Sequence, residues 1–328
     1  MTPESSSKKQ SVSATLGQLE FPVLDRSARL VLQSGLYSRL SISQDEIVKT
    51  IVVGDASARE GGAHDEAHMR TVALVRYQRR LESLGVCMPK TRIEESLSEL
   101  GAPTIEMVVE RIPNATALVT LPLAAAGDQY QFVACITREM TKVIHSQYGE
   151  MPVGYDSGFD NFILYGGCCY LIDIYPPRLG YLVRDDGCIE RLPPERLLVN
   201  YPEVAPLPPG KIAELQRCYY TPEGTAEHIA VWAIATACAR QDLDAHGHWW
   251  RLESAQSATE AVYDTLRHEG FARSVDPLHS FLSSVRGTQA VRHRHARVQS
   301  RFAPAFFQWE SICNLFSPQP AKDHVWAR

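Results

Sequence analysis

The order of strand and helix patterns along the chain is the feature that most narrows its fold. Four segments rich in β-branched residues lie in the first third, at 30–33, 38–43, 46–53 and 104–113. One helical pattern, 65–84, interrupts them, and from residue 130 onward the patterns are mainly helical apart from a short hairpin at 161–174. This order predicts an α+β chain in which a β-rich lobe precedes a helical lobe. We expect a tail at 1–17, an N-lobe at 18–113 and a C-lobe at 114–328.

Length, charge and cysteine content exclude several classes of protein. The 328 residues can bury a core without disulfides or structural metals. Lys and Arg number 33 against 38 for Asp and Glu, and the net charge of -5 argues against nucleic acid as a partner. The eight cysteines form no C-x-x-C pair and the N-terminus has no apolar signal segment, so we expect reduced thiols and a cytoplasmic protein. No apolar run approaches the ~20 residues of a membrane span, so we expect no membrane partner.

Chemically useful side chains are densest between residues 154 and 173, in GYDSGFDNFILYGGCCYLID. Asp156 and Asn161 stand in a predicted loop, and the hairpin would return Asp173 to the place where Asn161 begins. Carboxylate and amide oxygens suit Mg²⁺, and a carboxylate outside the metal shell can orient an attacking hydroxyl. The alternative for Asp156 and Asn161 is a loop cap and an Asx-turn. Asp173 ends an apolar strand, where an unpaired carboxylate is costly to bury.

The D-x4-N spacing, the apolar hairpin and the final Ile-Asp resemble the protein-kinase-like superfamily, especially its small-molecule branch of aminoglycoside and choline phosphotransferases. LQSGLYSRLSIS followed by EIVKTIV is similar to a nucleotide-covering hairpin and a lysine-bearing strand, and VVERIP at 108–113 resembles the hinge. The resemblance covers about residues 28–175. It implies a two-lobed fold with a five-stranded antiparallel N-lobe sheet, one main N-lobe helix, and ATP in the cleft.

The resemblance also implies a nucleotide site. Lys49 would contact the α- and β-phosphates and would be held by Glu66 near the start of the following helix, although Glu66 has an alternative role as a helix N-terminal charge. The remaining contacts would come from backbone groups: over the phosphates at Ser34, Gly35 and Ser38, and at the adenine edge from Glu110 to Ile112.

The same resemblance implies the chemistry. Asp156 would orient the acceptor hydroxyl and accept its proton, while Asn161 and Asp173 would hold Mg²⁺. The predicted activity is an ATP- and Mg²⁺-dependent phosphotransferase whose partner is the hydroxyl of a small molecule. Phosphoryl and nucleotidyl transfer both remain open, and neither the acceptor nor the oligomeric state follows from a motif between 176 and 328.

Departures from the family pattern define the alternatives. The catalytic triplet is Gly154-Tyr155-Asp156, where the family usually has His-Gly-Asp or His-Arg-Asp. The covering loop has one glycine in place of three, no glycine follows Asp173 as in Asp-Phe-Gly, and no Ala-Pro-Glu follows. These features favour a small-molecule kinase over a protein Ser/Thr kinase. They leave open a kinase-like binding or scaffold protein without turnover.

Three further features have competing interpretations. DLDAHGH, with Asp242, Asp244, His246 and His248, is either a metal site or an inter-helix loop, and its irregular ligand spacing favours the loop. Trp249 and Trp250 are either core residues or part of an acceptor pocket for a cationic or planar substrate. RHRHAR at 292–297 is interpreted as the solvated face of a helix, with phosphate or nucleic-acid contact as the alternative.

Overall fold

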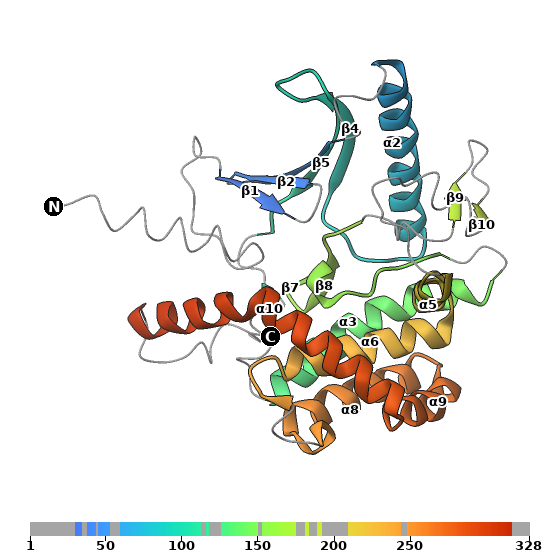
Figure 1. The fold of residues 1–328 in the computed structure, drawn as a ribbon, viewed down its shortest axis with the longest axis vertical. Helices are drawn as coiled ribbons and strands as arrows, with labels where there is room; N and C mark the ends of the chain where they lie inside the picture. Colours follow the sequence, from blue (N-terminus) through green and yellow to red (C-terminus); the bar gives the residue numbers. More distant parts are fainter. Residues whose placement is uncertain are drawn as a thin grey trace.

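The computed structural model shows a sheet with one helix standing on a body of helices (Figure 1). The residues that it describes are 30–34, 38–43, 45–52, 60–112, 116–117, 126–149, 153–174, 181–183, 189–191, 209–243 and 248–316.

The N-lobe sheet is antiparallel and has five strands in the order β1-β2-β3-β5-β4. The strands are β1 (Leu30–Ser34), β2 (Ser38–Ile42), β3 (Glu46–Val52), β4 (Thr91–Leu97) and β5 (Pro103–Glu110). β5 is buried along most of its length because β3 and β4 flank it, and Lys49 of β3 is paired with Met107. The sequence patterns had identified every strand of this sheet except β4, an edge strand in which only the isoleucine and the leucine of TRIEESL are apolar.

The N-lobe helix α2 (Glu60–Ser83) packs on β4 and β5 and begins five residues before the predicted 65. Its apolar side chains Leu74, Tyr77 and Leu81 are buried. The helix ends at Gly85, whose φ of 76° is easily reached only by glycine. The N–H groups of Gly85 and Val86 donate to the carbonyls of Glu82 and Leu81 at 2.9 and 3.1 Å, which is the Schellman arrangement expected of a glycine cap.

The C-lobe is a bundle around one central helix. Its helices are α3 (Ala126–Gln147), α5 (Pro209–Tyr220), α6 (Pro222–Ala237), the 3-10 turn η3 (Trp249–Arg251), α8 (Glu253–His268), α9 (Ala272–Leu282) and α10 (Val285–Phe316). α6 is buried on nearly every side and contacts α3, α5, α8, α9 and α10. None of the helices that the structure describes is long and apolar enough to cross a membrane.

A small sheet of three strands, ordered β6-β7-β8, lies where the lobes meet: β6 (Thr116–Ala117), β7 (Phe162–Tyr165) and β8 (Cys168–Leu171). Gly166 and Gly167 join β7 to β8 with φ values of 58° and 78°, as a two-residue I′ turn requires. Residues 176–210 are rich in proline and charge, a pattern typical of a loop, yet β9 (Tyr181–Val183) and β10 (Ile189–Arg191) pair as a hairpin there.

Hydrogen bonds tie the N-lobe to the helical body at the foot of α2. The Tyr77 hydroxyl donates to the Gly154 carbonyl at 2.9 Å, and the N–H of Leu171 donates to the Cys87 carbonyl at 2.9 Å. Lys142 of α3 donates to the Gly85 carbonyl at 2.7 Å. The fold is therefore α+β and two-lobed, with the lobe order of a protein-kinase-like chain. The predicted lobe boundary at 113 falls outside the described residues and stays a prediction.

Candidate active site

Lys49 and Asp173 meet across the two lobes. Lys49 Nζ donates to Asp173 Oδ1 at 2.9 Å, and 18% and 37% of the two side chains are exposed. Lys49 comes from the middle of β3, and Asp173 lies two residues beyond the end of β8. The sheet lobe and the hairpin thus bring a cation and a carboxylate to one partly open place.

The loop from 153 to 158 and the turn η2 (Phe159–Asn161) hold Asp156 and Asn161 close together. The N–H of Gly158 donates to Asp156 Oδ1 at 3.2 Å, and Asn161 Nδ2 donates to the backbone carbonyl of Asp156 at 3.1 Å. The backbone of Asn161 accepts from the N–H of Ile172 at 2.8 Å, next to Asp173. With its nitrogen used inside the loop, the Asn161 amide has its oxygen left for a cation.

A third carboxylate, Asp160, adds negative charge that the sequence analysis missed. Burial, together with smaller contributions from the charges of Asp160 and Asp173, raises the pKa of Asp156 to about 6, while the Gly158 N–H and Arg294 oppose the shift. A Cβ on Gly158 would meet Asp160 Oδ1 at 2.6 Å and Asn161 Nδ2 at 3.3 Å, so glycine lets these side chains close around the loop. A cation here would relieve the repulsion among the carboxylates.

The residues present fit Mg²⁺. The oxygens of Asp173 and Asn161 are hard donors, which Mg²⁺ prefers, and both residues belong to one connected segment. No group of three His, Cys, Asp or Glu side chains able to hold a metal gathers within the part of the chain that the structure describes. Mg²⁺ commonly takes one or two protein carboxylates and completes its shell with water and phosphate oxygens, so this small donor set suits it.

The structure leaves no room for a side chain at position 154, where the family that the sequence resembles usually has histidine. A Cβ on Gly154 would lie 2.0 Å from the Tyr220 ring, closer than any side chain allows. Tyr220 ends α5, and the neighbouring carbonyl of Tyr219 accepts from the N–H of Tyr155 at 3.0 Å. The α5–α6 corner therefore occupies the space beside the loop of Asp156.

A histidine still supports this loop, but it comes from α6. His228 is buried, its Nδ1 lies 2.6 Å from Ser157 Oγ, and its Nε2 lies 2.9 Å from Arg294 Nη2. Because a guanidinium only donates, Nε2 must accept, and the ring proton then sits on Nδ1 and points at Ser157. The Arg294 guanidinium also lies 4.4 Å from the centroid of the Trp232 ring.

The interpretation of RHRHAR as a solvated face was therefore wrong in part. Arg294 is half-buried beneath the loop, and burial lowers its pKa, as does Arg297, while Tyr219, Asp156 and Asp160 oppose the shift. His295 is buried and its Nε2 lies 2.9 Å from the Cys238 carbonyl. The helical period of α10 turns these two residues toward the body of the lobe. This period could have been found in the sequence, but counting the charges of the segment does not show it.

The predicted nucleotide contacts are described only in part. Ser34 and Ser38 form the last pair of the β1–β2 ladder, and Gly35 lies outside the described residues. Glu66 lies in α2, but its side chain is outside the described set, so its pairing with Lys49 stays a prediction. In the predicted hinge, the N–H of Glu110 donates to the Lys90 carbonyl at 2.8 Å. The N–H of Arg111 donates to the Asp45 carbonyl at 2.9 Å, so of the three predicted hinge residues only Ile112 has an N–H without a backbone partner among the described residues.

Comparisons with known proteins add little to this geometry. The chain matches no protein-family model, and no curated protein matches its sequence. It is similar to the solved structure of the Neurospora crassa PAN3 pseudokinase, at 11% identity and a TM-score of 0.32, over 96% of this chain and 80% of that chain. A mutant of that pseudokinase is similar at 11% identity and a TM-score of 0.35, over 96% and 73% of the two chains. Both TM-scores are below 0.5, so these two structures give no information on the function of this chain.

Proposed function

We propose that this protein is an ATP- and Mg²⁺-dependent phosphotransferase that acts on a hydroxyl of a small molecule. The observation that carries the proposal is the contact of Lys49 with Asp173 beside the loop of Asp156 and Asn161. A phosphate-binding cation, two oxygen donors for a metal and a separate carboxylate are the parts that phosphoryl transfer requires. Catalysis would come mainly from positioning and charge stabilisation.

Each side chain has a distinct task in this proposal. Lys49 binds the α- and β-phosphates once they replace Asp173 as its partner, and Asn161 and Asp173 supply metal ligands. Mg²⁺, when bound, neutralises the phosphate charge. Asp156 accepts the proton of the acceptor hydroxyl, and a pKa of about 6 keeps it largely ionised at neutral pH while it remains a better base than an ordinary aspartate.

The small-molecule acceptor and a cytoplasmic location are also part of the proposal. The acceptor class is supported by the sequence, which has no Ala-Pro-Glu after Asp173 and has Pro176-Pro177 where a protein kinase has an activation loop. The location is supported by the six cysteines that are free among the described residues. A protein Ser/Thr kinase is the less favoured form of the same activity.

A second candidate function is nucleotide or partner binding without turnover. It is favoured by the loop triplet, in which a buried Tyr155 and Gly154 replace the usual residues, and by the single glycine of the covering loop. The intact set of Lys49, Asp156, Asn161 and Asp173 opposes it.

Two measurements separate the candidates. Thermal shift with ATP, with and without Mg²⁺, tests the nucleotide site, and a screen of hydroxyl compounds for ATP consumption tests turnover. A Mg²⁺-dependent shift with acceptor-dependent ATP consumption supports the phosphotransferase. A shift without consumption for any acceptor supports the nucleotide-binding protein. No shift with ATP contradicts the phosphotransferase and leaves partner binding as the candidate function.

A further inference from the structure

A second pocket lies in the helical lobe, away from the candidate active site. It has a volume of about 450 Å³ and is lined by residues of η3, α8 and α9 and by Ser283, which follows α9. None of its lining residues belongs to the loop of Asp156 or to the segment of Asp173. In Figure 1, α8 and α9 lie at the end of the helical lobe opposite to the β7–β8 hairpin. The earlier alternative that Trp249 and Trp250 help to form the acceptor pocket is therefore not supported.

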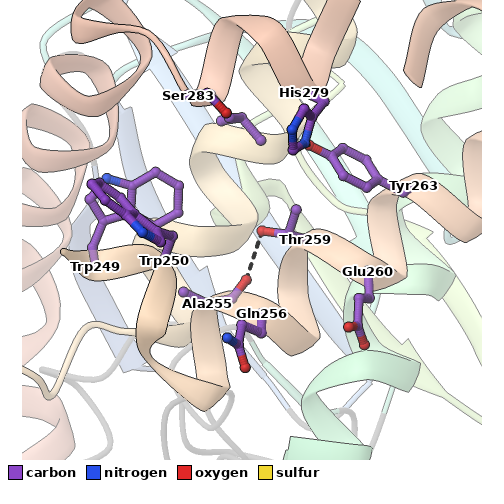
Figure 2. A pocket seen from close by; sticks show the side chains of 10 residues that line it. Trp249, Trp250, Ala255, Gln256, Thr259, Glu260, Tyr263, His279 and Ser283 are labelled. Carbon is purple, nitrogen blue, oxygen red and sulfur yellow. Dashed lines mark hydrogen bonds between the residues drawn. The ribbon is translucent and has the colours of Figure 1, made fainter. Parts of the chain in front are cut away.

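The walls of this pocket are aromatic. Figure 2 shows Trp249 and Trp250 at one end and Tyr263 with His279 at the other. The two indole rings are nearly perpendicular, at 83° with their centroids 5.8 Å apart, so they present one face and one edge. Trp249 is buried, whereas 46% of Trp250 is exposed. An exposed tryptophan beside a preformed hollow is a typical feature of a ligand site.

The charge of the lining is one-sided. Glu260 is the one carboxylate among the lining residues, and they include neither lysine nor arginine. The Thr259 hydroxyl already donates to the Ala255 carbonyl of its own helix at 2.7 Å, as the dashed line in Figure 2 shows. Besides the polar side chains of Tyr263, His279 and Ser283, the lining offers a ligand the Gln256 amide and one carboxylate, that of Glu260.

The fold already places a cation against an aromatic ring of this pocket. The Arg267 guanidinium lies 5.8 Å from the centroid of Tyr263, within the range of a cation–π contact. A tryptophan face attracts a cation more strongly than a tyrosine face does, and Trp250 has a large exposed area.

We propose that this pocket binds a small organic cation, with its flat or alkyl part against Trp249 and Trp250 and its charge toward Glu260. The volume of about 450 Å³ falls within the ordinary range for small-molecule sites. This inference goes beyond the proposed phosphotransferase activity and does not depend on it, because its ligand needs neither ATP nor Mg²⁺.

Benzamidine and benzamide provide a matched pair of probes, since they share a shape and differ in charge. Ligand-observed NMR titration of the full chain should show saturable binding of benzamidine at millimolar concentrations, and binding about tenfold weaker for benzamide. Trp250→Ala should abolish benzamidine binding. Glu260→Gln should reduce it to the level of benzamide, whereas Glu253→Gln, an exposed carboxylate of α8 outside the pocket, should leave it unchanged.

Three results would overturn the inference: no saturable binding of benzamidine, equal binding of the two probes, or binding that survives both Trp250→Ala and Glu260→Gln. The last result would place the probe elsewhere on the protein. Should Trp250→Ala fail to fold, Glu260→Gln decides the question alone, because an exposed glutamate contributes little to folding.

Discussion

Lys49 Nζ and Asp173 Oδ1 lie 2.9 Å apart, although 124 residues separate them in the chain. The contact joins β3 of the sheet lobe to the segment that follows β8. Both side chains remain partly exposed, and ion pairs of this kind contribute only about 1 kcal/mol or less to stability. A contact that is inexpensive to break suits a cleft in which the phosphates of a nucleotide must replace it.

Replacing Lys49 should affect nucleotide binding far more than stability. Lys49→Met removes the cation that we assign to the phosphates, and ATP affinity or turnover should fall by about 10–100-fold, the range for a lost charge-assisted hydrogen bond. Calorimetry with ATP measures the affinity. Lys90→Met, a change at an exposed lysine of the same lobe, is the matched control and should behave as the wild type. Equal ATP affinity in the two variants would contradict the assignment.

Replacing Asp173 tests the metal site. Asp173→Asn keeps the size of the side chain but removes the formal negative charge, which is needed to offset the dehydration of Mg²⁺. Mg²⁺-dependent turnover should be lost, and the Mg²⁺ dependence of the thermal shift with ATP should disappear. The melting temperature without ligands should change little, because the ion pair with Lys49 is partly exposed. Turnover at the wild-type rate would remove Asp173 from the metal site.

Asp156 should show opposite effects on activity and stability. Its pKa of about 6 lies above the ordinary value of 3.8, so the folded state loses stability as pH rises through this interval and the carboxyl ionises. Asp156→Asn should therefore stabilise the protein by about 1–3 kcal/mol at neutral pH, and the gain should vanish as the pH falls toward about 4. Urea denaturation at several pH values measures this. A destabilised variant at neutral pH would contradict the burial argument.

The same carboxylate should control turnover. Wild-type kcat should rise with pH through about 6 as Asp156 ionises. Asp156→Asn should lower kcat by ~10²–10⁴-fold and leave Mg·ATP affinity nearly unchanged, because a general base acts mainly in the transition state. Asn161→Ala should instead raise the Mg²⁺ concentration needed for activity. Loss of ATP affinity equal to the loss of turnover would place Asp156 in the nucleotide site.

The parts of the site that follow one another in sequence were predictable. The strand with Lys49, the loop of Asp156 and Asn161 and the hairpin before Asp173 each have a local pattern, and their order suggested that they share a cleft. The structure brings Lys49 and Asp173 into contact, while their roles stay predictions. The sequence patterns did not predict β4, because charged residues interrupt its alternation of apolar and polar residues. An edge strand tolerates such residues.

The supports of the loop were not predictable, because they come from distant helices. His228 meets Ser157 across 71 residues, and Arg294 meets His228 across 66. Which histidine lies beneath a loop depends on tertiary packing, and it cannot be predicted from the spacing of residues near the loop. The departure of Gly154 from the pattern of the resembled family was visible in the sequence, but the ring of Tyr220 that leaves no room for a side chain there was not.

His228 should be needed for both stability and turnover. His228→Ala leaves the buried Ser157 hydroxyl and the half-buried Arg294 without this partner, at a cost of about 1–3 kcal/mol. If the histidine also positions the loop, kcat should fall while ATP affinity stays near the wild-type value. Urea denaturation and separate measurements of kcat and ATP affinity check both effects. His268→Ala, at an exposed histidine of the same lobe outside both sites, is the control.

Gly154 should tolerate no side chain while Tyr220 is present. In Gly154→Ala the new Cβ would lie 2.0 Å from the Tyr220 ring and 2.4 Å from its hydroxyl oxygen, so either the ring or the loop must move. Overpacking of this kind costs about 1–3 kcal/mol, and a displaced loop would also lower kcat. Tyr220→Phe should not rescue the variant, because the ring atoms themselves are in the way.

Tyr220→Ala opens the space and makes the interaction measurable. Alone it should destabilise the protein, since a buried ring is lost. Combined with Gly154→Ala, it should add little further cost from the alanine, so the double variant should be more stable than the sum of the single effects predicts. Urea denaturation of the four proteins gives the coupling energy. Additive effects would show that the ring does not exclude a side chain at 154, and the exchange of histidine for glycine would then need another cause.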